Sequence, residues 1–170
     1  MPGHEEERDA FADRIFSSAL GYFDVLTIHL GQRLGLYRAI VELGRATPAE
    51  LAERAGIAER YAREWLEQQA TAGILHADVG PGVTTFDLPA GHAEVLLDGD
   101  SLSYMGASVM QLMALRGAFD QVVEAFRTGA GVPYEAYGID GVEGQGGANR
   151  PIFLSTLPDG WLPAIPDVHD

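Results

Sequence analysis

The sequence predicts a mainly α-helical protein that carries one winged helix-turn-helix with a small β-hairpin. Apolar residues recur at helical spacing in residues 8–43 and again in residues 101–128. Between these stretches, residues 47–88 read as two short helices followed by two strands around a Gly-Pro-Gly turn. We therefore divide the chain into three parts: residues 1–46 (a tail and helices), 47–97 (a winged unit) and 98–170 (a helical region and a connector).

The first part contains two predicted helices. After a short tail, residues 8–30 place Phe11, Ile15 and Phe23 at helical spacing, and residues 34–43 form a shorter helix closed by a glycine. These helices are unusually apolar for the start of a chain. Their side chains either fill an ordinary core or form a dimer interface, because apolar area that a small unit cannot cover must be buried elsewhere. The sequence of these helices favours an ordinary core and a dimer interface equally.

The second part opens on a strong helix-start signal. Thr47 can serve as N-cap, Pro48 takes the first helical position, and Glu50 stands where a capping box needs an acid. Gly56 can end this helix in the left-handed conformation. The elements that follow are a second helix, the two strands of the wing and a short helix, in residues 58–72, 74–79, 83–88 and 90–97.

The charge of the winged unit argues against DNA binding. A surface that follows phosphates needs clustered Lys or Arg. The second helix instead sets Arg60 and Arg63 against three glutamates, and the wing carries Asp78 and Asp87 without a basic residue. The whole chain has a net charge of −14, and its 11 basic residues are all arginine. Both observations argue against nucleic acid as a partner.

Composition excludes several further classes of protein. The chain contains no Cys, which excludes disulfides, thiolate zinc sites and a cysteine nucleophile. No apolar run approaches the roughly 20 residues that a membrane-spanning helix needs, and the polar, acidic N-terminus is unlike a secretory signal. We expect a cytoplasmic protein without a membrane partner.

The third part is predicted to begin with one long helix. Ser101 can cap a helix that runs to about Thr128 and buries a stripe containing Phe119. Methionines cluster in this helix, Met105 and Met113 among them. They either adapt the core packing, which we favour, or form a plastic wall for an apolar ligand.

A loop rich in Gly and Tyr is predicted over residues 129–147, before a short helix in residues 152–157 and a proline-containing connector. Its acidic, glycine-rich segment, residues 140–146, does not predict a nucleotide cradle, because such loops follow a buried strand and open a helix. Long loops with aromatic and polar groups often carry function. For the residues of this loop, packing between helical layers is the equal alternative. We predict five substrate-binding residues: Met105, Met113, Tyr134, Tyr137 and Gln145.

No catalytic, cofactor-binding or metal-ligating set is complete in the sequence. The five histidines are scattered, and none pairs with another at metal-ligand spacing. His29, on an apolar helix, is better explained as an interface histidine than as a ligand. No Ser stands in a nucleophile-elbow context. We therefore predict no catalytic residue, no cofactor-binding residue and no metal site.

Six segments carry a family resemblance. The two more specific ones are the Tyr segment (Val132-Pro133-Tyr134 with Tyr137-Gly138) and the connector Trp161-Leu162-Pro163-Ala164-Ile165-Pro166-Asp167-Val168. The others occupy residues 34–37, 47–52, 59–66 and 92–97. Together they resemble the amino-terminal half of a family of bacterial S-adenosylmethionine-dependent methyltransferases, and the resemblance covers most of residues 10–170.

In that family, helices and a winged-helix unit precede a Rossmann-like domain that holds the cofactor. The resemblance implies that residues 8–43 form a homodimer and that the chain helps to cover a small apolar or aromatic substrate. It also implies that S-adenosylmethionine binds a full-length relative and not this chain, which ends at Asp170, about where that domain would begin. We expect the chain to be inactive alone. Two alternatives stay open: a winged-helix transcriptional regulator that senses a small molecule, and a stand-alone small-molecule-binding protein.

Overall fold

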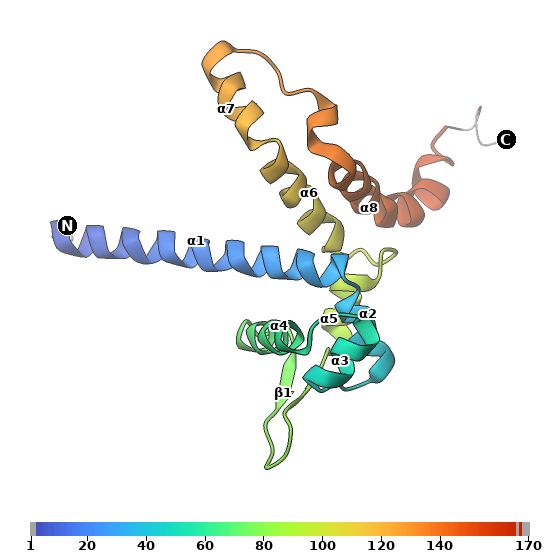
Figure 1. The fold of residues 1–170 in the computed structure, drawn as a ribbon. Helices are drawn as coiled ribbons and strands as arrows, with labels where there is room; N and C mark the ends of the chain where they lie inside the picture. The colour runs from blue at the N-terminus through green and yellow to red at the C-terminus, as the bar shows by residue number, and fades with distance from the viewer. Residues whose placement is uncertain (1–2, 166, 168–170) are drawn as a thin grey trace.

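The computed structural model describes residues 3–165 and 167. Helices make up 72% of the chain, which confirms the mainly α-helical class. One long helix, α1 (His4–Arg33), organises the molecule: its carboxyl-terminal end carries the winged unit on one side and a layer of later helices on the other (Figure 1). The amino-terminal end of α1 extends away from both (Figure 1).

The helix α1 is longer than the sequence predicts at both ends. The tail predicted before residue 8 is wrong for residues 4–7, because the helix already begins at His4. The backbone N–H of Gly3 donates to the Glu6 carboxylate (3.1 Å), and the acidic residues of the first turn stabilise the positive end of the helix dipole. Residues 1–2 of the expected tail lie outside the described residues.

The winged unit follows the local signals of its sequence. It contains α2 (Leu36–Leu43), α3 (Pro48–Ala55), α4 (Glu59–Thr71), β1 (His76–Asp78), β2 (Thr85–Asp87) and α5 (Ala90–Leu97). Thr47 caps α3 as predicted, and Gly56 ends it with φ +67°. The two strands are shorter than predicted and pair antiparallel, with His76 opposite Asp87. An isolated bridge between Ala46 and Phe86 extends this small sheet.

The buried core of the chain lies mainly in this winged unit. Its largest fully buried side chains include Tyr37, Ile40, Leu66 and Phe86. The rings of Tyr37 and Trp65 meet edge to face, with centroids 5.1 Å apart. Burial raises the pKa of the Tyr37 phenol above its usual value, because desolvation disfavours the charged form. The core therefore fixes α2 and α4 against each other.

The single helix predicted from Ser101 to Thr128 is wrong. Ser101 lies in a turn, where its hydroxyl donates to Glu94 (2.6 Å) and accepts from the backbone N–H of Ser103 (3.1 Å). The helical stretch begins later and breaks after Gly117, giving α6 (Gly106–Gly117) and α7 (Phe119–Thr128). The predicted burial of its apolar stripe is also wrong in part: Phe119 is 59% exposed and Phe126 is 89% exposed.

The loop predicted over residues 129–147 is wrong over most of its length. A short 3-10 helix, η1 (Tyr134–Tyr137), leads into α8 (Gly138–Thr156), which includes all but the last residue of the short helix predicted at residues 152–157. A π-helical segment, η2 (Leu157–Trp161), begins the predicted connector, of which residues 166 and 168 lie outside the described residues. The glycines of α8 permit close packing on α6: a Cβ at Gly144 would lie 3.1 Å from the Ala107 carbonyl oxygen. Tertiary packing thus overrides their low helix propensity.

Candidate functional site

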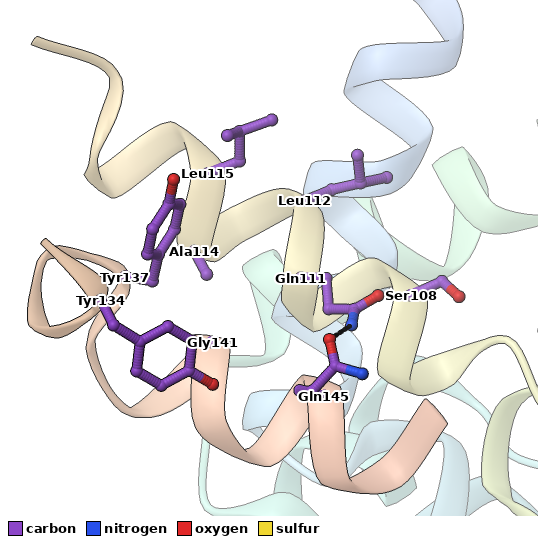
Figure 2. A pocket seen from close by; sticks show the side chains of 9 residues that line it. All are labelled: Ser108, Gln111, Leu112, Ala114, Leu115, Tyr134, Tyr137, Gly141 and Gln145. Atoms are coloured by element: carbon purple, nitrogen blue, oxygen red, sulfur yellow. Dashed lines mark hydrogen bonds between the residues drawn. The ribbon is translucent and has the colours of Figure 1, made fainter. Parts of the chain in front are cut away.

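A cavity of about 450 Å³ lies between α6 and the segment formed by η1 and α8. Two tyrosines from η1 face it, with ring centroids 6.2 Å apart and planes tilted by 48°. Figure 2 shows these rings on one side and the α6 side chains on the other. The residues that line the cavity are Ser108, Gln111, Leu112, Ala114, Leu115, Tyr134, Tyr137, Gly141 and Gln145.

The polar groups of the cavity are neutral amides and hydroxyls. Gln111 on α6 donates to Gln145 on α8 (3.1 Å), and Gln145 donates to Asn149 one turn further along (3.2 Å). Figure 2 shows the two glutamines pointing toward each other across the cavity. None of the lining residues is charged. Apolar and aromatic walls with a few fixed hydrogen-bonding groups are typical of small-molecule sites.

Three of the five predicted site residues line this one cavity: Tyr134, Tyr137 and Gln145. Met105 and Met113 do not belong to its lining: Met105 caps the start of α6 and is exposed, and Met113 is half-buried. That any of the five contacts a substrate stays a prediction.

Sequence reasoning missed the α6 side of the cavity. Ser108, Gln111, Leu112 and Leu115 recur at intervals of three and four residues, so they share one face of the helix. This spacing is visible in the sequence. The sequence did not reveal which element packs against this face, because residues 138–147 were predicted to be a loop and not a helix.

A second hollow adjoins the first on the other side of α6. It has a volume of about 810 Å³ and is bounded by α1 and by the junction of α6 with α7. Leu112 and Leu115 line both cavities. The adjoining surface of α1 is apolar and exposed over much of its length, at Phe11, Ile15, Phe16, Leu20, Tyr22, Phe23 and Leu30.

The helix α4, which corresponds to the recognition helix of a winged helix-turn-helix, is docked onto α1. The indole N–H of Trp65 donates to the Thr27 carbonyl (3.0 Å), and Gln68 donates to the Asp24 carboxylate (3.1 Å). The arginines on its outer face pair within the helix, Arg63 with Glu59 at 3.1 Å and Arg60 with Glu64 at 3.9 Å. These pairs leave no clustered positive charge on α4 for a phosphate backbone.

The acids of the wing meet one arginine from outside it. Arg45 contacts Asp78 at 2.8 Å and Asp87 at 3.4 Å. Arg45 precedes the winged unit predicted at residues 47–97, so its position beside these two aspartates was not predicted. Because Arg45 serves two carboxylates, it does not make the wing a cationic surface.

Two kinds of feature are absent from the part of the chain that the structure describes, residues 3–165 and 167. No group of three or more His, Cys, Asp or Glu side chains is placed to hold a metal ion there. None of the helices in these residues is both long and apolar enough to cross a membrane.

The glycine-rich stretch of α8 does not fit a nucleotide cofactor. Positions 144 and 147 lie against α6, where added Cβ atoms would come 2.9 Å from Gln111 Cγ and 3.0 Å from Ala107 Cβ. A phosphate-cradling loop instead presents its backbone to the ligand. The same residues that resemble such a loop in sequence therefore form a helix-packing surface.

Comparisons with known proteins agree with this architecture. Residues 23–97 match the model of the Rv2258c-like winged HTH domain. None of the curated proteins compared matches the chain.

Three solved structures share the fold. They are the mitomycin 7-O-methyltransferase MmcR (22% identity, TM-score 0.67, 89% of this chain and 47% of that one), an O-methyltransferase family protein from Burkholderia thailandensis (19%, 0.60, 85% and 43%), and PigF with SAH (20%, 0.57, 86% and 47%). This chain thus spans less than half the length of each. The fold of residues 23–97 is that of a winged helix-turn-helix, in agreement with the family model that matches these residues.

Proposed function

We propose that this chain is the dimerisation and substrate-cover part of an O-methyltransferase. The observation that carries the proposal is the uncharged cavity between α6 and α8, on a fold shared with chains of O-methyltransferases. In this proposal Tyr134, Tyr137 and the Gln111–Gln145 pair contact the substrate. The remaining residues of an active site would come from a part of the enzyme outside these 170 residues.

The cavity suits a small, flat and uncharged substrate. Its volume of about 450 Å³ falls within the range of small-molecule sites. The tilted tyrosine rings offer aromatic faces to a ring system. The amides of Gln111 and Gln145 can hydrogen-bond a carbonyl or hydroxyl at its edge. A charged ligand would lose hydration here without gaining an ionic partner.

The exposed face of α1 supports the dimer. Seven large apolar side chains are exposed along this helix, whereas monomeric proteins rarely expose contiguous apolar patches of more than a few hundred Å². The hollow between α1 and the α6–α7 junction adds an adjoining, mainly apolar surface to which a second copy could bind. A second copy of the chain would cover both surfaces, and we assign this role to residues 8–43.

S-adenosylmethionine would bind a full-length relative outside the residues described here, and when bound it supplies the transferable methyl group. This chain would contribute substrate contacts, shielding from water and the dimer contact. We accordingly propose that the chain alone transfers no methyl group. Methylation of a phenol by the purified 170-residue chain would overturn that part of the proposal.

Ligand binding tests the substrate-cover role directly. The fluorescent probe N-phenyl-1-naphthylamine is neutral and aromatic, and its emission rises in apolar surroundings. We expect saturable binding that Tyr134→Ala and Gln145→Ala weaken. Phe126→Ala removes an equally aromatic but remote and highly exposed side chain and should leave binding unchanged. Equal affinity in all four proteins would overturn the assignment of this cavity.

Sedimentation equilibrium tests the dimer. We expect a dimer for the wild type and a monomer for Phe16→Asp, which places a charge on the exposed face of α1. Val79→Asp adds the same charge on the exposed wing and should stay dimeric. A monomeric wild type across the accessible concentration range would refute the proposed interface.

A further inference from the structure

The first turn of α8 joins the candidate cavity to α1. Tyr137 and Gly141, on either side of this turn, line the cavity. Asp140 lies between them and faces the opposite way: its Oδ2 is 3.7 Å from His29 Nε2, and its Oδ1 is 3.6 Å from Arg33 Nη1. The first turn of α8 therefore lines the cavity on one side and makes an ionic contact with α1 on the other.

The contact is enclosed but incompletely bonded. The side chains of His29 and Asp140 are 17% and 26% exposed, and both distances exceed those of a normal hydrogen bond. His29 Nδ1, Gln32 Oε1 and Asp140 Oδ1 are buried and lack a hydrogen-bond partner among the described residues. Most buried polar atoms have a partner. The contact is therefore held mainly by charge.

The turn has little freedom to move independently of the cavity. A Cβ at Gly141 would lie 2.7 Å from Tyr137 Cβ and 3.6 Å from Ala114 Cβ. The backbone at Gly141 is thus packed between η1 and α6. A displacement of Asp140 would consequently displace the Tyr137 ring against Ala114 and Leu115, which lie across the cavity from α8.

We infer that Asp140 is a positioning residue: through His29 and Arg33 it fixes the aromatic wall of the cavity against α1. That the fixed wall serves a ligand rests on the proposed function; the contact itself does not. The coupling would let events on α1, including the arrival of a second copy of the chain, alter the shape of the cavity.

Arg33 is the fixed counter-charge of Asp140. His29 and the neutral Gln32 lie beside it on α1. The helix α6, which packs on α1 and α8, has Arg116 as its one charged residue, and that side chain lines the separate hollow beside α7. Loss of the Asp140 charge or of the Arg33 charge should therefore loosen the aromatic wall.

Hydrogen–deuterium exchange of the full chain tests the inference without a ligand. We expect residues 134–146 to exchange severalfold faster in Asp140→Asn than in the wild type. Asp140→Glu, which keeps the charge, should restore part of the protection. If Asp140→Asn fails to fold, Arg33→Gln at an exposed side chain replaces it, with faster exchange of the same residues expected.

The wing supplies a matched control. His76 Nδ1 lies 3.5 Å from Asp87 Oδ2, a second His–Asp pair that is remote from the cavity. Asp87→Asn should leave the exchange of residues 134–146 unchanged. Unaltered exchange in Asp140→Asn, or an equal rise in Asp87→Asn, would overturn the inference.

Probe affinity separates this inference from the proposed function. N-phenyl-1-naphthylamine should bind more weakly to Asp140→Asn than to the wild type, and Asp87→Asn should bind it as the wild type does. If the exchange results appear as expected but the probe does not bind the cavity, the positioning contact stands and the ligand role fails.

Discussion

The hydroxyl group of Tyr37 donates a hydrogen bond to the side-chain oxygen of Gln69 inside the winged unit. Both side chains are 0% exposed. The amide nitrogen of Gln69 donates in turn to the Thr27 hydroxyl on α1 (3.1 Å). A polar path through the core therefore links α2, α4 and α1, and it explains how a buried glutamine is tolerated among apolar side chains.

Replacing Tyr37 with Phe tests this path. The variant leaves the buried oxygen of Gln69 without its donor, and we expect the free energy of unfolding to fall by about 1–3 kcal/mol. Urea denaturation followed by circular dichroism measures the change. Tyr61→Phe alters an exposed tyrosine on α4 and should change stability by less than about 0.5 kcal/mol. Equal effects of the two substitutions would contradict the role given to the buried hydrogen bond.

Gly31 allows α1 to approach the aromatic pair of the winged unit. An added Cβ would lie 2.5 Å from Trp65 Cζ2 and 2.8 Å from Tyr37 Cε2. Because both rings are buried, Gly31→Ala should overpack this junction and cost about 1–3 kcal/mol. Gly91→Ala, on α5 with open space around the new Cβ, should not destabilise the protein. The urea midpoints of the two variants measure this difference in stability. A Gly31→Ala variant as stable as the wild type would show that α1 packs less closely on Trp65 and Tyr37.

Two glycines of α8 should respond in opposite ways to the same substitution. A Cβ at Gly144 would lie 2.9 Å from Gln111 Cγ and 3.0 Å from the Gln111 backbone nitrogen, whereas Gly146 has nothing within 4 Å. Gly144→Ala should push α8 off α6 and lower stability by about 1–3 kcal/mol. Gly146→Ala should be neutral or stabilising by up to about 1 kcal/mol, because alanine favours the helix. Thermal denaturation of the pair is the measurement, and a stabilising Gly144→Ala would refute the close packing.

The same glycines explain where prediction from sequence stopped. Residues 47–97 could be predicted because their signals are local: Thr47 with Glu50 at a helix start, Gly56 at its end, and a Gly-Pro-Gly turn between strands. Residues 138–147 could not, because their glycines disfavour a helix locally and the packing of Gly144 and Gly147 on α6 has no local signal in the sequence. Ser101 was misplaced for a related reason, since its hydroxyl bonds to Glu94, seven residues earlier.

The candidate site was predicted in part for the same physical reason. Tyr134, Tyr137 and Gln145 stood out by residue type, and the structure gathers them around one cavity. Gln111 and Leu115 could be recognised as cavity residues only from the packing of α8 against their face of α6. Residue type thus predicted part of the η1 and α8 side of the cavity, whereas the α6 side could be identified only from the tertiary packing.

The capping box of α3 makes a prediction about acid stability. The Glu50 carboxylate accepts hydrogen bonds from the backbone N–H of Thr47 (2.8 Å) and from its hydroxyl (2.8 Å). These bonds, the backbone one foremost, lower the pKa of Glu50 in the folded protein. A lowered folded-state pKa stabilises the protein above the unfolded-state value, roughly 4.3 for glutamate, and the contribution is lost as the pH falls through the folded-state pKa.

Glu50→Gln should therefore lower the urea midpoint at pH 7, because the charged acceptor at the positive end of the helix dipole is gone. The gap between the wild type and Glu50→Gln should begin to narrow as the pH falls below the unfolded-state pKa. It should close as the pH falls through the lower folded-state pKa, where Glu50 of the folded wild type is protonated too. Glu53→Gln removes the same charge from the exposed surface of the same helix without touching Thr47. A gap between wild type and Glu50→Gln that persists unchanged at pH 3, or that Glu53→Gln reproduces, would assign the effect to overall charge and not to the capping box.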